Sequence, residues 1–355
     1  MNKPNLGVVY CANNDYVMPT CISLCSVLEN NRNAPTNEQV ELSVHIFAEN
    51  WTEKSVQIIT EMTKKYSVDL FFYNPEKIIE KLQKLDPEPW CGTYSADVRL
   101  YVAEYIDVDY NICCLDSDVI MNKNQNLYEL AVFNFENEKK CCASTIDMQS
   151  SPIVKKESRL KENEHIYNTN GIFLLNPKLY IRHKVIEAFE TASKDIALIY
   201  KPYKDVLRNA YALKGNITPL PMKYQVYPGQ KLLKIPQWLF LFALNQKQYY
   251  SKNEIEAALK NPVFIHFVNF IVQKPWYISK IRDFPFFDIW EYYRSLTVFR
   301  DLVPKEDITS GLDMIKLFFY KYLRIPYVLL CASAYRLEVM QRNKKIRNNI
   351  KEHRS

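Results

Sequence analysis

The chain has 355 residues, of which 48% are hydrophobic and 24% are charged. This composition is typical of a globular protein with one large or two ordinary domains, and it excludes a disordered or fibrous chain. The net charge of +6 is concentrated at one end, because residues 316–355 contain ten Lys or Arg residues and only two acidic residues. The rest of the chain is slightly acidic. This balance argues against nucleic-acid binding and places any attraction to polyanions in the tail.

The nine cysteines follow neither a zinc-binding nor a disulfide pattern, so they indicate buried thiols in a reducing compartment. We find no basic and apolar leader at the N-terminus, and no run of about 20 apolar residues that would span a membrane. We therefore expect a cytoplasmic protein.

The first 73 residues alternate between strand and helix patterns. Apolar or alternating runs predict strands over 6–10, 40–46 and 68–73, and helical periodicity predicts helices over 20–29 and 52–66. This order predicts an α/β fold with a mostly parallel, Rossmann-like sheet flanked by helices. The carboxyl ends of its strands are then the natural place for a ligand.

The pattern continues with predicted helices over 75–85 and 96–105 and an apolar strand over 110–115. Later strands are predicted over 141–146, 171–175 and 263–268, and Ser251 and Glu254 form a capping box for a helix that ends at Lys260. The polar residues between 148 and 167 suggest a mobile lid or acceptor loop. The six glycines form neither a dinucleotide-binding nor a P-loop pattern, which disfavours those sites.

Two carboxylates, Asp116 and Asp118, directly follow the apolar strand over 110–115. Like charges in apolar surroundings repel each other, and a divalent cation removes this cost. Carboxylate ligands suit Mg²⁺ or Mn²⁺, which keep open positions for water and phosphate. An isolated Asp-x-Asp is more often a solvated turn, but the buried strand before it favours a metal site.

Other polar residues could complete a nucleotide diphosphate site, although each has a simpler explanation by itself. His266 lies in an apolar strand, and Lys274 precedes Pro275 and Trp276, a rigid aromatic platform that suits a phosphate contact. Arg99 lies on a predicted helix. Asp15 and Tyr16 follow the first strand, where they could contact a base or cap a helix. Together these residues supply a metal ligand, cations and a base pocket.

In its ordered motifs the chain resembles the retaining glycosyltransferases of family 8, which include bacterial lipopolysaccharide galactosyl- and glucosyltransferases and glycogenin. The resemblance runs over about residues 6–276. The segments that carry it are 8–16, 99–105, 115–119, 143–147, 167–176, His266 and 274–276.

The resemblance implies a GT-A fold, a nucleotide-sugar donor that is usually a uridine diphosphate (UDP) sugar, and Mn²⁺ or Mg²⁺. It implies that the metal ligands are Asp116, Asp118 and His266 and that Asp147 and Asp205 position sugars in catalysis. The residues that it assigns to the donor are Cys11, Ala12, Asn13, Asp15, Tyr16, Arg99, Ser117, Thr169, Asn170, Lys204 and Lys274.

Four positions depart from the family pattern: Asn13 replaces an acid, Thr169 replaces part of an Asn-Ala-Gly motif, Lys204 replaces a glutamine and Asn269 replaces a glycine. The resemblance implies a metal-dependent retaining enzyme that moves galactose or glucose from a UDP-sugar to a glycan or glycolipid, in lipopolysaccharide or capsule synthesis. The departures leave open a catalytically weakened sugar-nucleotide-binding or scaffold homologue. A nucleotidyltransferase would use similar metal chemistry, but it predicts a glycine-rich loop that we do not find.

We expect two regions, a catalytic domain over 1–280 and an aromatic, then basic and helical, region over 281–355. Apolar and cationic residues alternate in the tail, which favours a peripheral contact with an anionic membrane surface, on the inner face of the cytoplasmic membrane. A solvated terminal helix is the alternative for residues 342–355.

Overall fold

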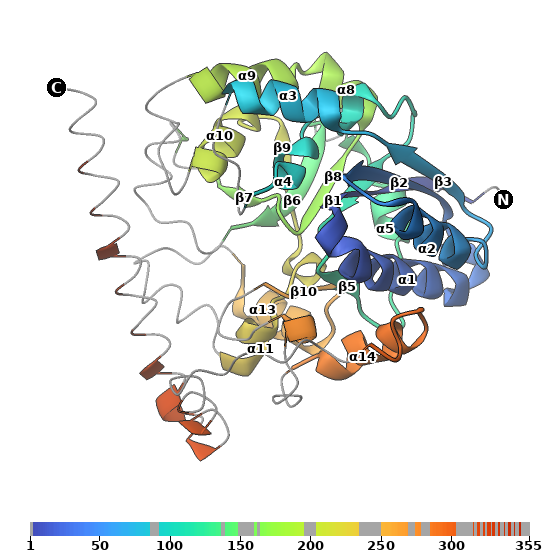
Figure 1. Ribbon diagram of the computed structural model, residues 1–355. Helices are drawn as coiled ribbons and strands as arrows, with labels where there is room; N and C mark the ends of the chain where they lie inside the picture. Colours follow the sequence, from blue (N-terminus) through green and yellow to red (C-terminus); the bar gives the residue numbers. More distant parts are fainter. Residues whose placement is uncertain are drawn as a thin grey trace.

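The computed structural model describes residues 3–85, 92–135, 139–147, 160–161, 164–194, 204–233, 250–268, 274–277, 285–302 and scattered positions between 315 and 348. The predicted loop over 148–167 lies mostly outside these residues. Figure 1 shows a central sheet with helices on both sides. The expectation of a mostly parallel sheet flanked by helices is therefore confirmed.

Four parallel strands form the first half of the sheet, in the order β3-β2-β1-β4. Their bounds are β1 Asn5–Asn13, β2 Glu41–Glu49, β3 Asp69–Tyr73 and β4 Ile112–Leu115. Leu6, Val8, Val9 and Tyr10 of β1 are fully buried, because helices cover both faces of the sheet as parallel strands require. In Figure 1, α1 (Val17–Asn33) and α2 (Glu53–Thr63) lie on one side and α3 (Glu76–Leu85) on the other.

The second half of the sheet is mixed. Strand β8 (Ile172–Leu175) pairs antiparallel with β4 and with β6 (Cys142–Ile146). Strand β6 also pairs antiparallel with β7 (Tyr167–Asn168) and parallel with β9 (Ile217–Leu220). The helices of this half are α8 (Pro177–Arg182), α9 (Val185–Lys194), α10 (Lys204–Ala212) and α11 (Pro228–Leu233).

A separate two-stranded sheet lies beside the end of β4. Strand β5 (Val119–Met121) pairs antiparallel with β10 (Phe264–His266), and the register places His266 opposite Val119. The strand expected over 263–268 is thus shorter and belongs to this small sheet. Helix α13 (Lys252–Lys260) precedes β10 and begins with the expected capping box of Ser251 and Glu254. Helix α5 (Tyr128–Ala131) follows β5.

The helix expected over 96–105 is wrong, because this segment forms the short helix α4 (Ser95–Val98) and the 3₁₀ turn η3 (Val102–Glu104). Arg99 Nε donates to Ala96 O at 2.7 Å. That carbonyl would otherwise accept the amide of Leu100, which instead bonds to Asp97 O. Arg99 thereby ends the α-helix in favour of 3₁₀ geometry. The other 3₁₀ turns are η1 (Asn14–Tyr16), η2 (Thr36–Glu38), η4 (Met222–Tyr224) and η5 (Pro275–Tyr277).

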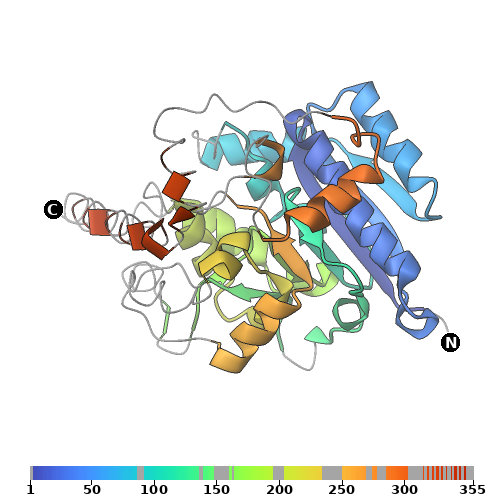
Figure 2. The same ribbon diagram turned by 90° about the horizontal axis from the view of Figure 1, so that it is seen from below.

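The aromatic segment after residue 280 contains helix α14 (Phe287–Ser295), which packs against α1 (Figure 2). Trp290 and Tyr293 are buried, and Asn30 Nδ2 on α1 donates to Tyr293 Oη at 2.7 Å. Packing on the body is therefore the role of this segment. No helix among the described residues is long and apolar enough to cross a membrane.

Replacement of Tyr293 by Phe leaves one N–H of the buried Asn30 amide unsatisfied. We expect the Tyr293→Phe variant to lose about 1–2 kcal/mol in free energy of unfolding, measured in urea. Tyr292→Phe is the matched control. Tyr292 is 40% exposed and contacts Lys123 through its ring, so this variant should lose less than about 0.5 kcal/mol. Equal losses for both variants would contradict the hydrogen-bond explanation.

Candidate metal and nucleotide site

The two acids lie in a tight turn between β4 and β5. Asp116 N donates to Gly171 O at 3.1 Å, and Val119 N donates back to Asp116 O at 3.0 Å. Between the acids, Ser117 is buried and its Oγ lies 2.8 Å from Thr20 Oγ1 on α1. The turn is thus fastened to β8 on one side and to α1 on the other, which fixes the direction of both carboxylates.

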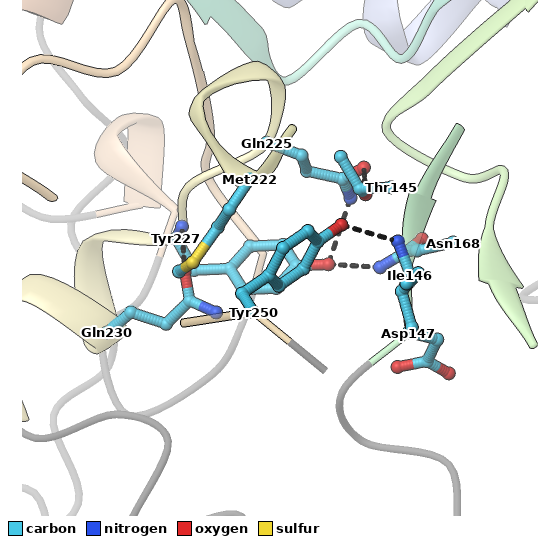
Figure 3. Close-up of a pocket in the computed structure, with 9 residues that line it drawn as sticks. All are labelled: Thr145, Ile146, Asp147, Asn168, Met222, Gln225, Tyr227, Gln230 and Tyr250. Atoms are coloured by element: carbon cyan, nitrogen blue, oxygen red, sulfur yellow. Dashed lines mark hydrogen bonds between the residues drawn. The ribbon is translucent and has the colours of Figure 1, made fainter. Parts of the chain in front are cut away.

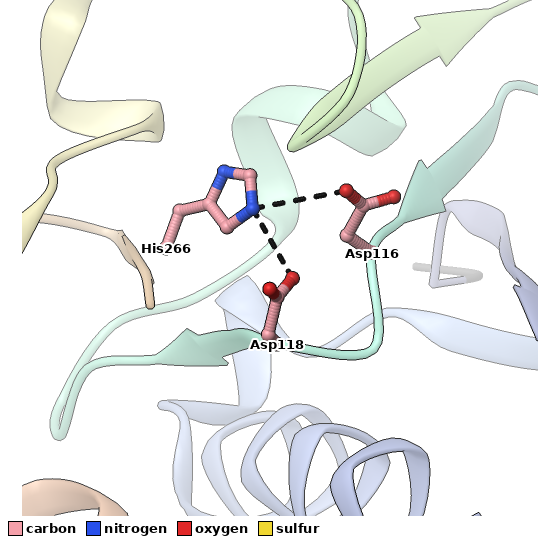
Figure 4. A group of neighbouring side chains, drawn as sticks. All are labelled: Asp116, Asp118 and His266. Carbon is pink, nitrogen blue, oxygen red and sulfur yellow. Dashed lines mark ion pairs between the residues drawn. The ribbon is translucent and has the colours of Figure 1, made fainter. Parts of the chain in front are cut away.

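His266 faces both acids, as Figure 4 shows. Its Nε2 lies 3.1 Å from Asp118 Oδ1 and 3.7 Å from Asp116 Oδ2. One ligand atom from each residue falls within 4.8 Å of the other two. Two carboxylate oxygens and one imidazole nitrogen form a donor set that fits a divalent ion such as Mn²⁺ or Mg²⁺. The structure therefore brings together the three metal ligands that the resemblance implies.

Two cations balance the acids from opposite sides. Arg99, which is 5% exposed, donates through Nη2 to Asp116 Oδ1 and through Nη1 to Thr169 O at 2.8 Å. Lys274 Nζ lies 2.8 Å from Asp118 Oδ2 and 3.3 Å from Tyr16 Oη. Each carboxylate thus has its own cationic partner as well as His266.

These partners give the two carboxylates different electrostatics. Burial would raise the pKa of Asp118, but the charge and hydrogen bonds of His266 and Lys274 outweigh burial and lower it. Burial raises the pKa of Asp116, and Arg99 offsets that effect only in part. Burial also opposes the charge on Lys274, but Asp118 outweighs it and raises the pKa of the ammonium group. Asp118 and Lys274 therefore form a charged pair at neutral pH.

Several residues expected to bind the base and ribose lie at the end of β1. Asn13 Oδ1 is buried and has no hydrogen-bond partner among the described residues. Tyr16 is half-buried and meets the Trp276 ring edge-on, with 6.3 Å between ring centroids. Asp15 is exposed. Cys11 is half-buried, and the Ala12 carbonyl accepts a hydrogen bond from Trp51 Nε1 at 2.8 Å.

The residues expected to contact sugars lie just after β6, just after β7 and at the start of α10. Asp147 is half-buried just after β6 and lines a small pocket (Figure 3). Thr169 is buried and Asn170 is exposed, in the turn that precedes β8. Lys204 and Asp205 begin α10, and their side chains lie outside what the structure describes.

The sequence interpretation missed Gln225, which contacts His266 from behind. Gln225 Nε2 lies 3.1 Å from His266 Nδ1 and donates to Tyr227 Oη at 2.9 Å. The only signal in the sequence is a glutamine between Tyr224 and Val226. Nothing in that pattern points to His266, which lies 41 positions further along the chain.

Comparison with known proteins matches this arrangement to one family. Residues 7–278 match the sequence model described as Glycosyl transferase family 8, and this range is most of the chain. A search of curated proteins found no match.

Two solved structures share the fold at low sequence identity. One is the apo structure of WbbM, described as a bifunctional glycosyltransferase, with 16% identity and a TM-score of 0.63. The alignment covers 84% of this chain and 50% of WbbM, so the chain spans about half of that protein. The other is the galactosyltransferase LgtC in complex with donor and acceptor sugar analogues, with 17% identity, a TM-score of 0.61 and coverage of 84% and 98%. These likenesses show a shared GT-A fold.

Removal of the buried Arg99 guanidinium leaves the half-buried Asp116 carboxylate without its closest cation. We expect Arg99→Ala to lose about 3 kcal/mol in free energy of unfolding in urea without added metal, because one partner of a buried ion pair is gone. Arg300→Ala is the control, since the Arg300 and Asp301 side chains are 69% and 88% exposed. It should lose less than about 0.5 kcal/mol. Similar stability of the two variants would show that Arg99 does not balance Asp116.

Proposed function

The chain belongs to glycosyltransferase family 8, and we propose that it is a metal-dependent retaining hexosyltransferase. In this proposal it moves galactose or glucose from a UDP-sugar to a glycan or glycolipid, in lipopolysaccharide or capsule synthesis. The observation that carries the proposal is the convergence of Asp116, Asp118 and His266 within 4.8 Å, beside the Lys274 ammonium. This arrangement suits a divalent ion bound to a diphosphate.

Asp116, Asp118 and His266 would hold Mn²⁺ or Mg²⁺, and the ion would stabilise negative charge on the leaving diphosphate as a Lewis acid. Lys274 would add a second positive charge there, since its Nζ already lies at the cluster. Such charges favour the transition state over the ground state, because the leaving group gains charge as the bond to the sugar breaks.

The surroundings of Asn13 support the proposal that the site binds a uracil base. Its buried Oδ1 has no partner among the described residues, and a buried acceptor is costly until a donor reaches it. The N3–H of uracil is a donor of the required kind. Tyr16 and Trp276 form an aromatic corner nearby, and Asp15 at the same turn would bind the ribose. Cys11 and Ala12 would contact the nucleotide at the end of the same strand.

For the sugar, we assign Asp147 and Asp205 to positioning in catalysis. Thr169, Asn170, Lys204 and Ser117 would contact the donor. Arg99 would contact the donor sugar, and its hydrogen bonds to Asp116 and to the Thr169 carbonyl hold it in position. A scaffold that binds a sugar nucleotide without turning it over is the alternative, which the departures at Thr169, Lys204 and Asn269 leave open.

A thermal-shift panel tests donor and metal together, with UDP, GDP and CMP and their sugars, each with and without Mn²⁺. We expect UDP with Mn²⁺ to raise the melting temperature by several degrees, because a ligand at 100 times its Kd adds about 2.7 kcal/mol to the native state. Asp118→Asn should abolish this shift, whereas Asp288→Asn on α14 should keep it. A full shift in Asp118→Asn, or a shift with GDP alone, would contradict the proposal.

Turnover separates the enzyme from the scaffold. With Mn²⁺ we expect the wild type to release UDP from UDP-galactose or UDP-glucose. We expect Asp118→Asn to lower the rate of this release by at least about 100-fold. Binding of UDP and Mn²⁺ without any release of UDP in the wild type would favour the scaffold.

We further propose that residues 1–280 form the catalytic domain and that residues 281–355 form a C-terminal region whose basic tail, after residue 315, contacts an anionic membrane surface on the cytoplasmic side. The support is the composition of the tail, since its described residues include many exposed apolar side chains. These are Ile315, Phe318, Tyr322, Leu323, Ile325, Leu329, Leu330, Leu337 and Met340. Apolar and basic residues in one helical segment suit the headgroup layer of a membrane.

Co-sedimentation with vesicles of phosphatidylglycerol and phosphatidylcholine tests the tail in the full chain. A variant with Arg342, Lys344, Lys345 and Arg347 changed to Gln should bind at least tenfold more weakly, because each basic residue near anionic lipid adds about 1 kcal/mol. The control changes Lys54, Lys64, Lys77 and Lys84, which are exposed on the body, to Gln. Equal binding by both variants would rule out the tail as the contact.

A further inference from the structure

Behind His266 lies a buried polar network that no part of the proposed mechanism uses. Gln225 is 4% exposed and its amide reaches three side chains. Its Nε2 lies 3.1 Å from His266 Nδ1 and 2.9 Å from Tyr227 Oη, and its Oε1 lies 2.9 Å from Thr145 Oγ1. Asn168 Nδ2 donates to the same Tyr227 hydroxyl. Figure 3 shows the Gln225 amide between Thr145 and Tyr227.

The two orientations of this amide have different consequences for His266. With Nε2 of Gln225 toward the ring, His266 Nδ1 must accept, so the proton of a neutral ring lies on its Nε2 and faces Asp118. With the amide turned over, its oxygen accepts from His266 Nδ1–H, and the Nε2 lone pair of the ring faces the carboxylates. A metal needs this lone pair, and ligating histidines in proteins usually donate their other N–H to a fixed acceptor.

The surroundings of Gln225 satisfy the turned orientation. The amide oxygen would accept from both His266 Nδ1–H and the Tyr227 hydroxyl, while the amide nitrogen would donate to Thr145 Oγ1. The Tyr227 oxygen would still accept from Asn168. Each group keeps a complementary partner, because hydroxyl groups can donate or accept. The network therefore accommodates the acceptor that a metal-bound His266 requires.

Packing also restrains Gln225 against the ring. A Cβ added to Gly171 would lie 2.4 Å from Gln225 Nε2, 2.5 Å from its Cδ and 2.6 Å from His266 Nδ1. The backbone of Gly171 thus approaches both side chains at their point of contact. The Gly171 carbonyl also accepts a hydrogen bond from the Asp116 amide. Gly171 thus couples the turn that carries the acids to the Gln225–His266 contact.

We propose that Gln225 is a positioning residue that fixes the orientation and the proton-bearing nitrogen of His266 through its side-chain oxygen, so that His266 Nε2 serves as a metal ligand. In this role Gln225 acts through its contact with His266. This inference rests on the proposed function, because it assumes that Asp116, Asp118 and His266 bind a divalent ion.

Mn²⁺ titration of the full chain by isothermal calorimetry tests this role directly. Gln225→Met keeps the approximate size of the side chain but removes the acceptor, and we expect Mn²⁺ binding to weaken 10- to 100-fold, as for other residues that support metal ligands. Gln225→Glu presents only acceptor oxygens to His266 and should bind Mn²⁺ within about threefold of the wild type. A merely structural role predicts no such rescue by Glu.

Gln230→Met is the matched control. Gln230 is also fully buried at this pocket, but its Oε1 accepts from Tyr227 N, and it should leave Mn²⁺ affinity within about twofold. Thr145→Val removes the group that orients the far end of the Gln225 amide, so it should weaken Mn²⁺ binding about three- to tenfold. This variant decides the question if Gln225→Glu does not fold.

The outcomes separate this inference from the proposed function. No Mn²⁺ binding by the wild type would overturn the metal site itself. Binding by the wild type together with unchanged affinity in Gln225→Met would overturn the role of Gln225 alone. Equal loss in Gln225→Met and a folded Gln225→Glu would also overturn it, because the acceptor oxygen would then make no difference.

Discussion

The site depends on the electrostatic cost of placing two carboxylates at the buried end of β4. Asp116 and Asp118 lie in one tight turn, and the protein offsets their repulsion with separate partners rather than with one shared cation. Arg99 holds one acid and Lys274 the other, and His266 faces both. Both acids thus have charged partners, and the three residues that would bind a metal lie close together.

This balance explains why distant segments converge on one edge of the sheet. Arg99 comes from a helix that its own side chain interrupts, and His266 comes from a short strand paired with β5. Lys274 directly precedes the 3₁₀ turn η5, whose Trp276 meets the Tyr16 ring edge-on. Each of these residues belongs to a separate short segment of the sequence, and the fold brings the segments together around the turn that carries Asp116 and Asp118.

Much of the first half of the fold could be predicted from the sequence, because its strands and helices have clear periodicity. Residues 6–10 and 110–115 are apolar runs of the kind that parallel strands buried on both faces require. The helix expected over 96–105 was wrong because periodicity does not reveal that the Arg99 side chain donates a hydrogen bond to the Ala96 carbonyl, which a continuing α-helix would use. The proposed metal site at Asp116 and Asp118 followed from two carboxylates directly after an apolar strand, and the family resemblance added His266. Gln225 could not be found, because its role depends on a contact between segments that no local pattern records.

The small β5–β10 sheet joins segments that are far apart in the sequence, so it affects when the site forms during folding. Lys274 and Asp118 are separated by 156 positions, and His266 lies in β10, which pairs with β5 directly after the acid turn. Contacts this distant in sequence close late, because chain entropy opposes them until much of the core is in place. During synthesis the turn that carries Asp116 and Asp118 leaves the ribosome well before His266, so the cluster of these three side chains forms only when the last part of the domain folds.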